Sequence, residues 1–179
     1  MRKNLSVWQL GGMTFATALG TLLHFIYDWT GWLFATPFSA VNESTWEHMK
    51  ILFFPMLLFA VFQYFFFRKE YPAFWWIKLI GIVIGTSSIP LLFYTWSGAF
   101  GPPPGVVNVL FFFVSAGLAY YVEFLLFKKN FTLKAPYIAF IALLIIAALF
   151  VVLTFFPPRL PLFQDPIDGT YGVKAARIG

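Results

Sequence analysis

Five long apolar segments constrain this 179-residue chain more than any other feature of its sequence. Each is close to the roughly 20 residues that cross a bilayer as a helix. They lie near residues 7–28, 46–67, 73–97, 105–127 and 136–156. Because 60% of the residues are hydrophobic, one aqueous core of this size cannot bury them all, and the excess must face lipid. The sequence therefore predicts an all-α integral membrane bundle of about five transmembrane helices, formed by residues 1–179 as one domain.

The placement of lysine and arginine predicts the orientation of this bundle. If the five segments cross the membrane in turn, one side holds Arg2, Lys3, Arg68, Lys69, Lys78, Lys128, Lys129 and Lys134. The other side holds only Lys50, Arg159, Lys174 and Arg177. The positive-inside rule then puts the N-terminus in the cytoplasm and the C-terminus outside, in the cell membrane. Since the basic residues flank apolar spans, the net charge of +5 does not indicate a nucleic-acid partner. Membrane lipid is the expected partner, and protein partners stay open.

The first segment carries a polar stripe that ends in a histidine and an aspartate. Thr14, Thr17, Thr21, His24 and Asp28 are separated by three or four residues, which keeps them on one face of a helix. A polar face is costly in lipid, so we expect it to point into the bundle, with threonine hydroxyls bonding to other helices. His24 and Asp28 can meet directly as a ligand pair, a proton-sharing couple or a structural ion pair. Arg2 and Lys3 also suit a signal peptide, but the apolar run is long, and we expect an uncleaved span.

The second segment opens with Asn42-Glu43-Ser44-Thr45-Trp46-Glu47-His48. Ser44 and Glu47 fit a capping box, in which Ser44 accepts from the Glu47 amide and Glu47 reaches back. The box does not explain Glu43 or His48. Antiparallel packing of the first two helices would bring His24 and His48 to similar depth, with Asp28, Glu43 and Glu47 just above them.

These five residues are the predicted catalytic group. The chain has no cysteine, so a metal site must use imidazole and carboxylate ligands, and His24, His48 and Glu47 are the predicted ligands of a divalent metal such as zinc. Glu47 and His48 point about 100° apart on one helix, so both reach a single site only if helices surround it. A metal-free proton relay or a substrate-anchoring site fits the same residues.

Substrate-binding residues are expected at the same side of the membrane. Residues 157–179 combine proline, apolar anchors and an Asp-Gly turn, and we expect this tail to fold over the outer mouth. It would bring Arg159, Asp165 and Asp168 towards the histidines, with Arg159 holding a substrate carboxylate or phosphate. Asn108, just inside the fourth segment, is a further candidate. The alternative is a surface cap that only shields helix ends.

Two features outside this group are expected to be structural. Lys78 and Glu123 lie at matching depth inside the third and fourth segments, which predicts a buried ion pair. Residues 29–41 are rich in aromatic side chains but too few to cross the membrane. They predict a stretch that lies in the interface or dips inward as a lid.

Two segments carry a resemblance to a known group of proteins. Asn42-Glu43-Ser44-x-Trp46-Glu47-His48-x-Lys50 and the tail from Pro157-Pro158 to Tyr171-Gly172 resemble the hallmarks of a family of small multi-pass bacterial membrane proteins of unknown function. The resemblance covers nearly the whole chain and implies no activity, cofactor or substrate. A more distant similarity is to zinc-dependent membrane hydrolases of the alkaline ceramidase and adiponectin receptor type. Their three-histidine site cannot be built from the two histidines here.

Three functions fit the sequence. The leading hypothesis is a membrane-embedded hydrolase that acts on a lipid or an apolar-tailed substrate. The second is a binding or transport subunit for a cation or small solute, which uses the same polar groups. The third is a non-catalytic accessory protein whose polar residues only tie helices together.

Overall fold

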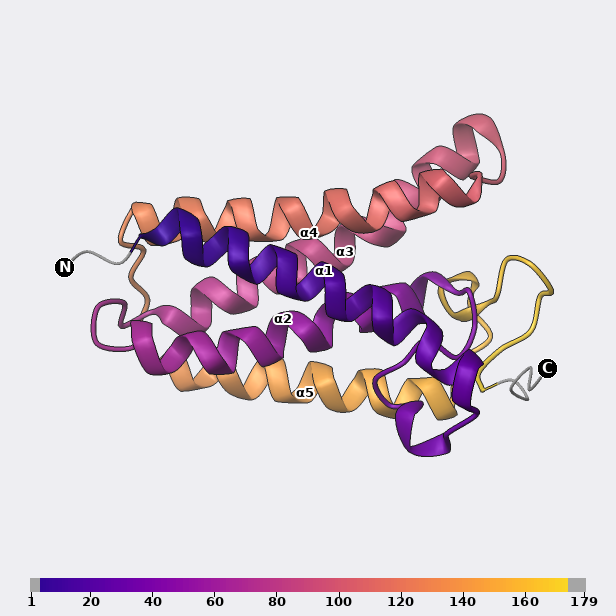
Figure 1. Ribbon diagram of the computed structural model, residues 1–179, viewed down its shortest axis with the longest axis horizontal. Helices are drawn as coiled ribbons and strands as arrows, with labels where there is room; N and C mark the ends of the chain where they lie inside the picture. Colours follow the sequence, from indigo (N-terminus) through magenta and orange to yellow (C-terminus); the bar gives the residue numbers. More distant parts are fainter. Residues whose placement is uncertain (1–3, 174–179) are drawn as a thin grey trace.

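Residues 4–173 are described by the computed structural model, and they form five long helices joined by short connections (Figure 1). The helices are α1 (Leu5–Thr30), α2 (Thr45–Phe67), α3 (Phe74–Phe100), α4 (Gly105–Lys128) and α5 (Pro136–Phe155), with short 3-10 helices η1 (Leu33–Ala35) and η2 (Pro161–Phe163). Each of the five is long and apolar enough to cross a membrane. The described residues contain no strand beyond one isolated bridge, Gln164 to Tyr171. The predicted all-α bundle is confirmed. Arg2, Lys3, Lys174 and Arg177, used above for orientation, lie outside the described residues.

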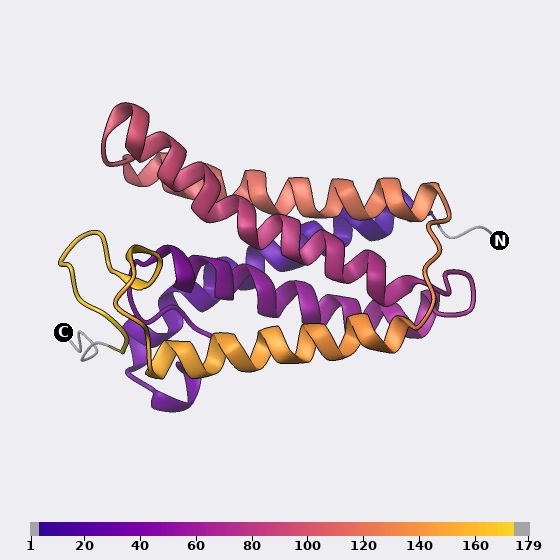
Figure 2. The same ribbon diagram turned by 180° about the vertical axis from the view of Figure 1, so that it is seen from behind.

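The helices run up and down, so the connections gather at two ends. The described chain begins at the end that holds the α2–α3 and α4–α5 connections (Figures 1 and 2). The opposite end, called the site end below, holds the α1–α2 loop, the α3–α4 turn and residues 156–173. Helix α1 packs on α2 and α4, while α3 packs on α2, α4 and α5. In both views the α3–α4 turn leans away from the rest of the site end.

Small residues on α1 allow this close packing. Ala16 is fully buried, and Gly12 and Gly20 are buried on the same face. A Cβ added to Gly20 would lie 2.6 Å from the Phe112 ring of α4 and 2.7 Å from the backbone oxygen of Ile51 in α2. At Gly20, helix α1 therefore packs so closely against both α2 and α4 that there is no room for a larger side chain.

The predicted Lys78–Glu123 ion pair is confirmed between α3 and α4. Lys78 Nζ lies 2.5 Å from Glu123 Oε2, and both side chains are almost completely buried. Four aromatic rings surround the ammonium group at 5.6–6.0 Å, those of Phe59, Phe74, Tyr120 and Phe127. A buried charge of this kind is held by its partner and by the rings, which lower its cost in an apolar interior.

The connection from α1 to α2 divides into an exposed half and a buried half. Its first half presents Trp32, Leu33 and Phe34, and these side chains and Trp29 in the last turn of α1 are each more than half exposed. Such an aromatic surface at the end of an apolar helix suits the membrane interface. In the second half Ser39 is fully buried, and its hydroxyl accepts from the amide of Tyr27 and donates to the carbonyl of Leu23. The loop is thereby fastened to the last turns of α1.

Candidate functional site

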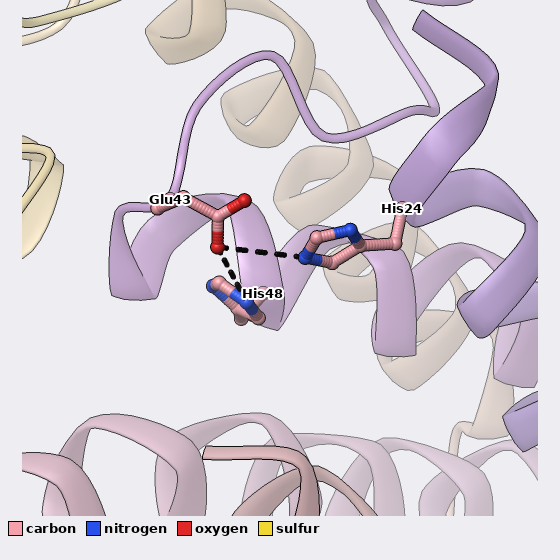
Figure 3. Close-up of side chains that lie close together, drawn as sticks. All are labelled: His24, Glu43 and His48. Carbon is pink, nitrogen blue, oxygen red and sulfur yellow. Dashed lines mark ion pairs between the residues drawn. The ribbon is translucent and has the colours of Figure 1, made fainter. Parts of the chain in front are cut away.

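Two histidines and one glutamate meet at the site end of the bundle (Figure 3). His24 lies on α1, His48 on the first turn of α2, and Glu43 on the loop just before α2. One ligand atom from each residue lies within 4.8 Å of the other two. We call these three residues the His–Glu cluster. Helices α1 and α2 pack side by side as predicted, which brings the two imidazole rings to 5.2 Å between centroids.

Glu43 lies between the two imidazoles. Its Oε2 is 3.6 Å from His24 Nε2 and 3.7 Å from His48 Nε2. The His48 Nδ1 is 2.9 Å from the carbonyl oxygen of Ser44, and because a carbonyl only accepts, Nδ1 carries the hydrogen. The Nε2 lone pair of His48 is then directed to the cluster, the arrangement in which a backbone carbonyl orients a metal-binding histidine.

The hydrogen bonds at the N-terminus of α2 explain how Glu43 and His48 are positioned. Ser44 caps α2 by accepting from the amide of Glu47 at 3.4 Å, and the Ser44 amide donates to Asn42 Oδ1 at 2.9 Å. The second half of the predicted capping box is wrong, since Asn42 rather than Glu47 satisfies the Ser44 amide. This frees the side chain of Glu47 for other contacts.

Glu47 belongs to a separate buried network and does not join the His–Glu cluster. Its Oε2 lies 2.5 Å from Lys50 Nζ and accepts from the Val41 amide, while its Oε1 accepts from the Thr154 hydroxyl of α5. Lys50 also donates to Thr154 and to the carbonyl of Thr36, each at 2.9 Å. Glu47, Lys50, Thr36 and Thr154 are each at most 1% exposed. Glu47 therefore links α2, α5 and the loop.

The segment after α5 packs against the start of α2. Asp165 is fully buried, and its carboxylate accepts from the Glu43 amide at 3.0 Å and the Ile167 amide at 2.8 Å. Asn42 donates to the carbonyl of Gly172 at 2.9 Å. The Trp46 ring lies between those of Phe150 and Phe163, at 4.5 and 4.6 Å. These contacts hold the loop that carries Glu43.

Two cavities of opposite character meet at the His–Glu cluster. The first, of about 140 Å³, is polar and is lined by His24, Tyr27, Asp28, Ala40, Val41, Asn42, Glu43, Asp165, Ile167 and Asp168. The second, of about 390 Å³, is mostly apolar and is lined by Thr21, His24, Phe25, Glu43, His48, Ile51, Gly105, Asn108, Val109, Phe112 and Phe113. We call them the polar cavity and the apolar groove. His24 and Glu43 line both, so the cluster is reached from either side.

The other predicted residues fall into three groups. Asp28 and Asp168 line the polar cavity, and Asn108 lines the apolar groove. Asp165 is occupied by backbone amides. Arg159 is exposed and lines neither cavity, so the predicted contact with a substrate head group has no support at either one.

The threonine stripe also differs from the prediction. The Thr17 and Thr21 hydroxyls donate to the carbonyls of Met13 and Thr17 on their own helix, at 2.9 and 2.8 Å. The predicted bonds to other helices are therefore wrong for these two residues. A hydroxyl four residues after a helical carbonyl reaches it without any partner helix. Thr21 still lies in the apolar groove, close to the cluster.

Sequence reasoning missed the wall of the groove and the partners of Glu47. Phe112 and Phe113 look like ordinary membrane-facing residues, and no local signal marks them. Lys50 does carry a signal, since it follows Glu47 by three residues on one helix. Thr154 is more than a hundred residues away and has none.

Comparison with known proteins agrees with the expectation of a family without an assigned activity. The matching family model is a family of unknown function (DUF6512), and it covers residues 1–173. The chain belongs to this family. No curated protein and no solved structure matches the chain.

Proposed function

We propose that this chain is a membrane-embedded, divalent-metal-dependent hydrolase whose metal ligands are His24, Glu43 and His48. The observation that carries the proposal is the convergence of two imidazole nitrogens and one carboxylate oxygen from three chain segments. In a tetrahedral zinc site the ligand atoms are roughly 3.4 Å apart, from bond lengths of about 2.0–2.2 Å. The distances of 3.6 and 3.7 Å from Glu43 to the histidines are close to that spacing, and all three ligand atoms lie within 4.8 Å of one another.

Three protein ligands would leave one position of a tetrahedral zinc ion for water, as in catalytic rather than structural sites. Zinc held there would lower the proton affinity of that water, which is the chemistry that hydrolysis of an ester or amide needs. Asp28 lines the polar cavity beside His24, and it would take the water proton and pass it to the leaving alcohol or amine as the carbon–oxygen or carbon–nitrogen bond breaks.

The surroundings favour a substrate that enters from lipid. The apolar groove reaches the cluster between α1 and α4, both long and apolar enough to lie in a bilayer. A volume of about 390 Å³ falls within the usual range for small-molecule sites, about 300–1,000 Å³. We further propose that the site end faces outward from the cell membrane, since Arg68, Lys69, Lys128 and Lys129 belong to the opposite end.

Zinc analysis of purified protein tests the proposal. We expect about one zinc ion per chain, loss of it in Glu43→Gln, and retention in the control Glu70→Gln, which removes an equal charge from an exposed position at the other end. Folding of each variant is checked by circular dichroism and gel filtration. Full zinc retention by folded Glu43→Gln contradicts the site.

A second assay separates the hydrolase from the other two functions. Zinc-loaded protein is given long-chain esters in micelles, and is also reconstituted into vesicles for zinc uptake. Ester cleavage that depends on Glu43 supports the hydrolase. Zinc uptake without cleavage identifies a transport protein, and neither activity with an intact zinc site identifies an accessory protein.

A further inference from the structure

A second groove between α1 and α4 lies at the end of the bundle opposite the site end. The start of α1 and the last turns of α4 come together at that end (Figures 1 and 2). The groove has a volume of about 290 Å³, and its lining includes Gln9 and Met13 of α1 and Gly117, Tyr121 and Phe124 of α4. We call it the basal groove. None of these residues lines the polar cavity or the apolar groove, so the basal groove is a separate feature of the fold.

Gln9 brings a buried amide without a hydrogen-bond partner to this groove. The residue is 5% exposed, and neither its side-chain oxygen nor its side-chain nitrogen has a hydrogen-bond partner among the described residues. Burying an amide in an apolar environment without a partner is costly, and most buried polar groups in proteins are hydrogen-bonded for that reason. A ligand that lies in the basal groove with a polar group beside Gln9 would remove this cost.

The depth of Gln9 in the membrane limits the groups that could bind it. Helix α1 has 26 residues, so it is about 39 Å long, which is about 9 Å more than a hydrocarbon core of about 30 Å. When the helix is centred, about 4–5 Å at each end lies in the head-group region. Gln9 follows Leu5, the first residue of α1, by a rise of about 6 Å, which places it at the boundary of the core. The ester carbonyls of glycerolipids lie at this boundary, and they accept the hydrogen that the Gln9 amide can donate.

The charge at the mouth of the basal groove favours an anionic head group. Lys128 is the last residue of α4, and its Nζ lies 6.0 Å from the centre of the Phe124 ring, which lines the groove. Gly117, Tyr121, Phe124 and Lys128 follow one another at intervals of three or four residues, so they share one face of α4. The exposed charged residues at this end of the described chain are Arg68, Lys69, Glu70, Lys128, Lys129 and Lys134. Residues 1–3 lie outside the described part and contain no acid. A lipid phosphate at the mouth therefore meets positive charge.

We propose that the basal groove binds an anionic glycerophospholipid, with its phosphate at Lys128, an ester carbonyl at the Gln9 amide, and one acyl chain along α1 and α4. The floor for this chain is formed where α1 and α4 touch, since a Cβ added to Gly117 would lie 3.6 Å from the Met13 Cε. The lipid comes from the leaflet at the end opposite the site end. Its binding does not depend on the proposed hydrolase, because the basal groove and the His–Glu cluster share no residue.

Three lipids with chains of equal length test the head group and the carbonyl separately. Dioleoyl phosphatidylglycerol, dioleoyl phosphatidylcholine and an ether-linked phosphatidylglycerol without ester carbonyls are titrated into purified protein in an uncharged detergent. Native mass spectrometry measures the affinity and number of bound lipids. We expect the ester phosphatidylglycerol to bind about fivefold more tightly than the choline lipid, and about threefold more tightly than the ether lipid. The absence of either preference overturns the proposal.

Matched variants assign each preference to a residue. Lys128→Gln should lower the affinity for ester phosphatidylglycerol about fivefold, while Lys129→Gln, which removes an equal charge from the next exposed residue, should change it little. Gln9→Leu should abolish the advantage of the ester lipid over the ether lipid. Gln63→Leu is its control and should keep that advantage, because Gln63 is also buried without hydrogen-bond partners but does not line the basal groove. Equal losses in the two lysine variants, or in the two glutamine variants, contradict the position given to the lipid.

The test does not depend on the stability of any variant. Gln9→Leu is expected to fold, because it replaces an unpaired buried amide with an apolar side chain of similar size, and circular dichroism checks this. If a variant fails to fold, the comparison of the three lipids on the unmodified protein still decides whether the phosphate and the carbonyl are recognised.

Discussion

The buried pair of Glu47 and Lys50 offers the sharpest test of how the site end is held together. Replacing Lys50 with Met removes the ammonium group 2.5 Å from Glu47 and leaves a carboxylate that is 1% exposed. Breaking a buried ion pair by removing one partner costs about 3–5 kcal/mol. The Val41 amide and the Thr154 hydroxyl still bond to the remaining carboxylate, so we expect a loss of about 3 kcal/mol.

The assay is unfolding in mixed micelles by increasing SDS, with zinc content measured on the folded fraction. The double variant Glu47→Gln, Lys50→Met removes both charges and should be more stable than either single variant. The two single variants and the double variant should each keep about one zinc per folded chain, because Glu47 is not in the His–Glu cluster. Additive losses in the double variant would refute the ion-pair reasoning. Loss of zinc in Glu47→Gln alone would restore Glu47 as a ligand.

Three further predictions concern packing and the loop. Gly20→Ala should lower the free energy of unfolding by about 1–3 kcal/mol, because its Cβ would lie 2.6 Å from a ring of α4 and 2.7 Å from a backbone oxygen of α2. The control Gly11→Ala, whose Cβ would have nothing within 4 Å, should leave the stability in the same SDS titration unchanged or raise it. Asp165→Ala removes the carboxylate that accepts from the amides of Glu43 and Ile167, and should weaken zinc binding about tenfold or more. Competition with a zinc chelator measures this affinity. An unchanged affinity would show that the segment after α5 does not position the loop that carries Glu43. Lys78→Met removes the cation that pairs with Glu123 in the other half of the bundle, and should lower the free energy of unfolding by about 3–5 kcal/mol without changing the zinc content. A loss of zinc in the folded variant would show that this ion pair and the His–Glu cluster are not independent.

The fold was predictable because length and hydropathy alone identify a membrane helix. Each predicted segment matches a helix to within about three residues, and the separators are the polar and proline-rich stretches. The pairing of α1 with α2 was also predictable. Consecutive elements usually pack side by side, and His24 and His48 each lie a few residues from the connection between these two helices.

The choice between two glutamates was harder to predict. Glu47 is adjacent to His48 and Glu43 lies five residues before it, but only the fold shows which carboxylate meets the imidazoles. Glu47 points from α2 towards α5, where Thr154 and the loop carbonyl of Thr36 complete a shell around Lys50. A contact between residues more than a hundred positions apart leaves no periodic trace in one sequence. The same is true of Asp165, which looks like a substrate-binding residue until its amide partners are seen.

The division between the two glutamates has a physical reason. A carboxylate 2.5 Å from an ammonium group has its charge already balanced, and a cation approaching it would meet the lysine as well. Glu43 is 37% exposed in its side chain, and its carboxylate lies 3.6 and 3.7 Å from the two imidazoles and lines both cavities. A catalytic metal ion exchanges water or substrate at its open position, so its site must be reached from a cavity. The balanced pair therefore fixes the loop, and the residue four positions earlier presents its carboxylate to the two histidines.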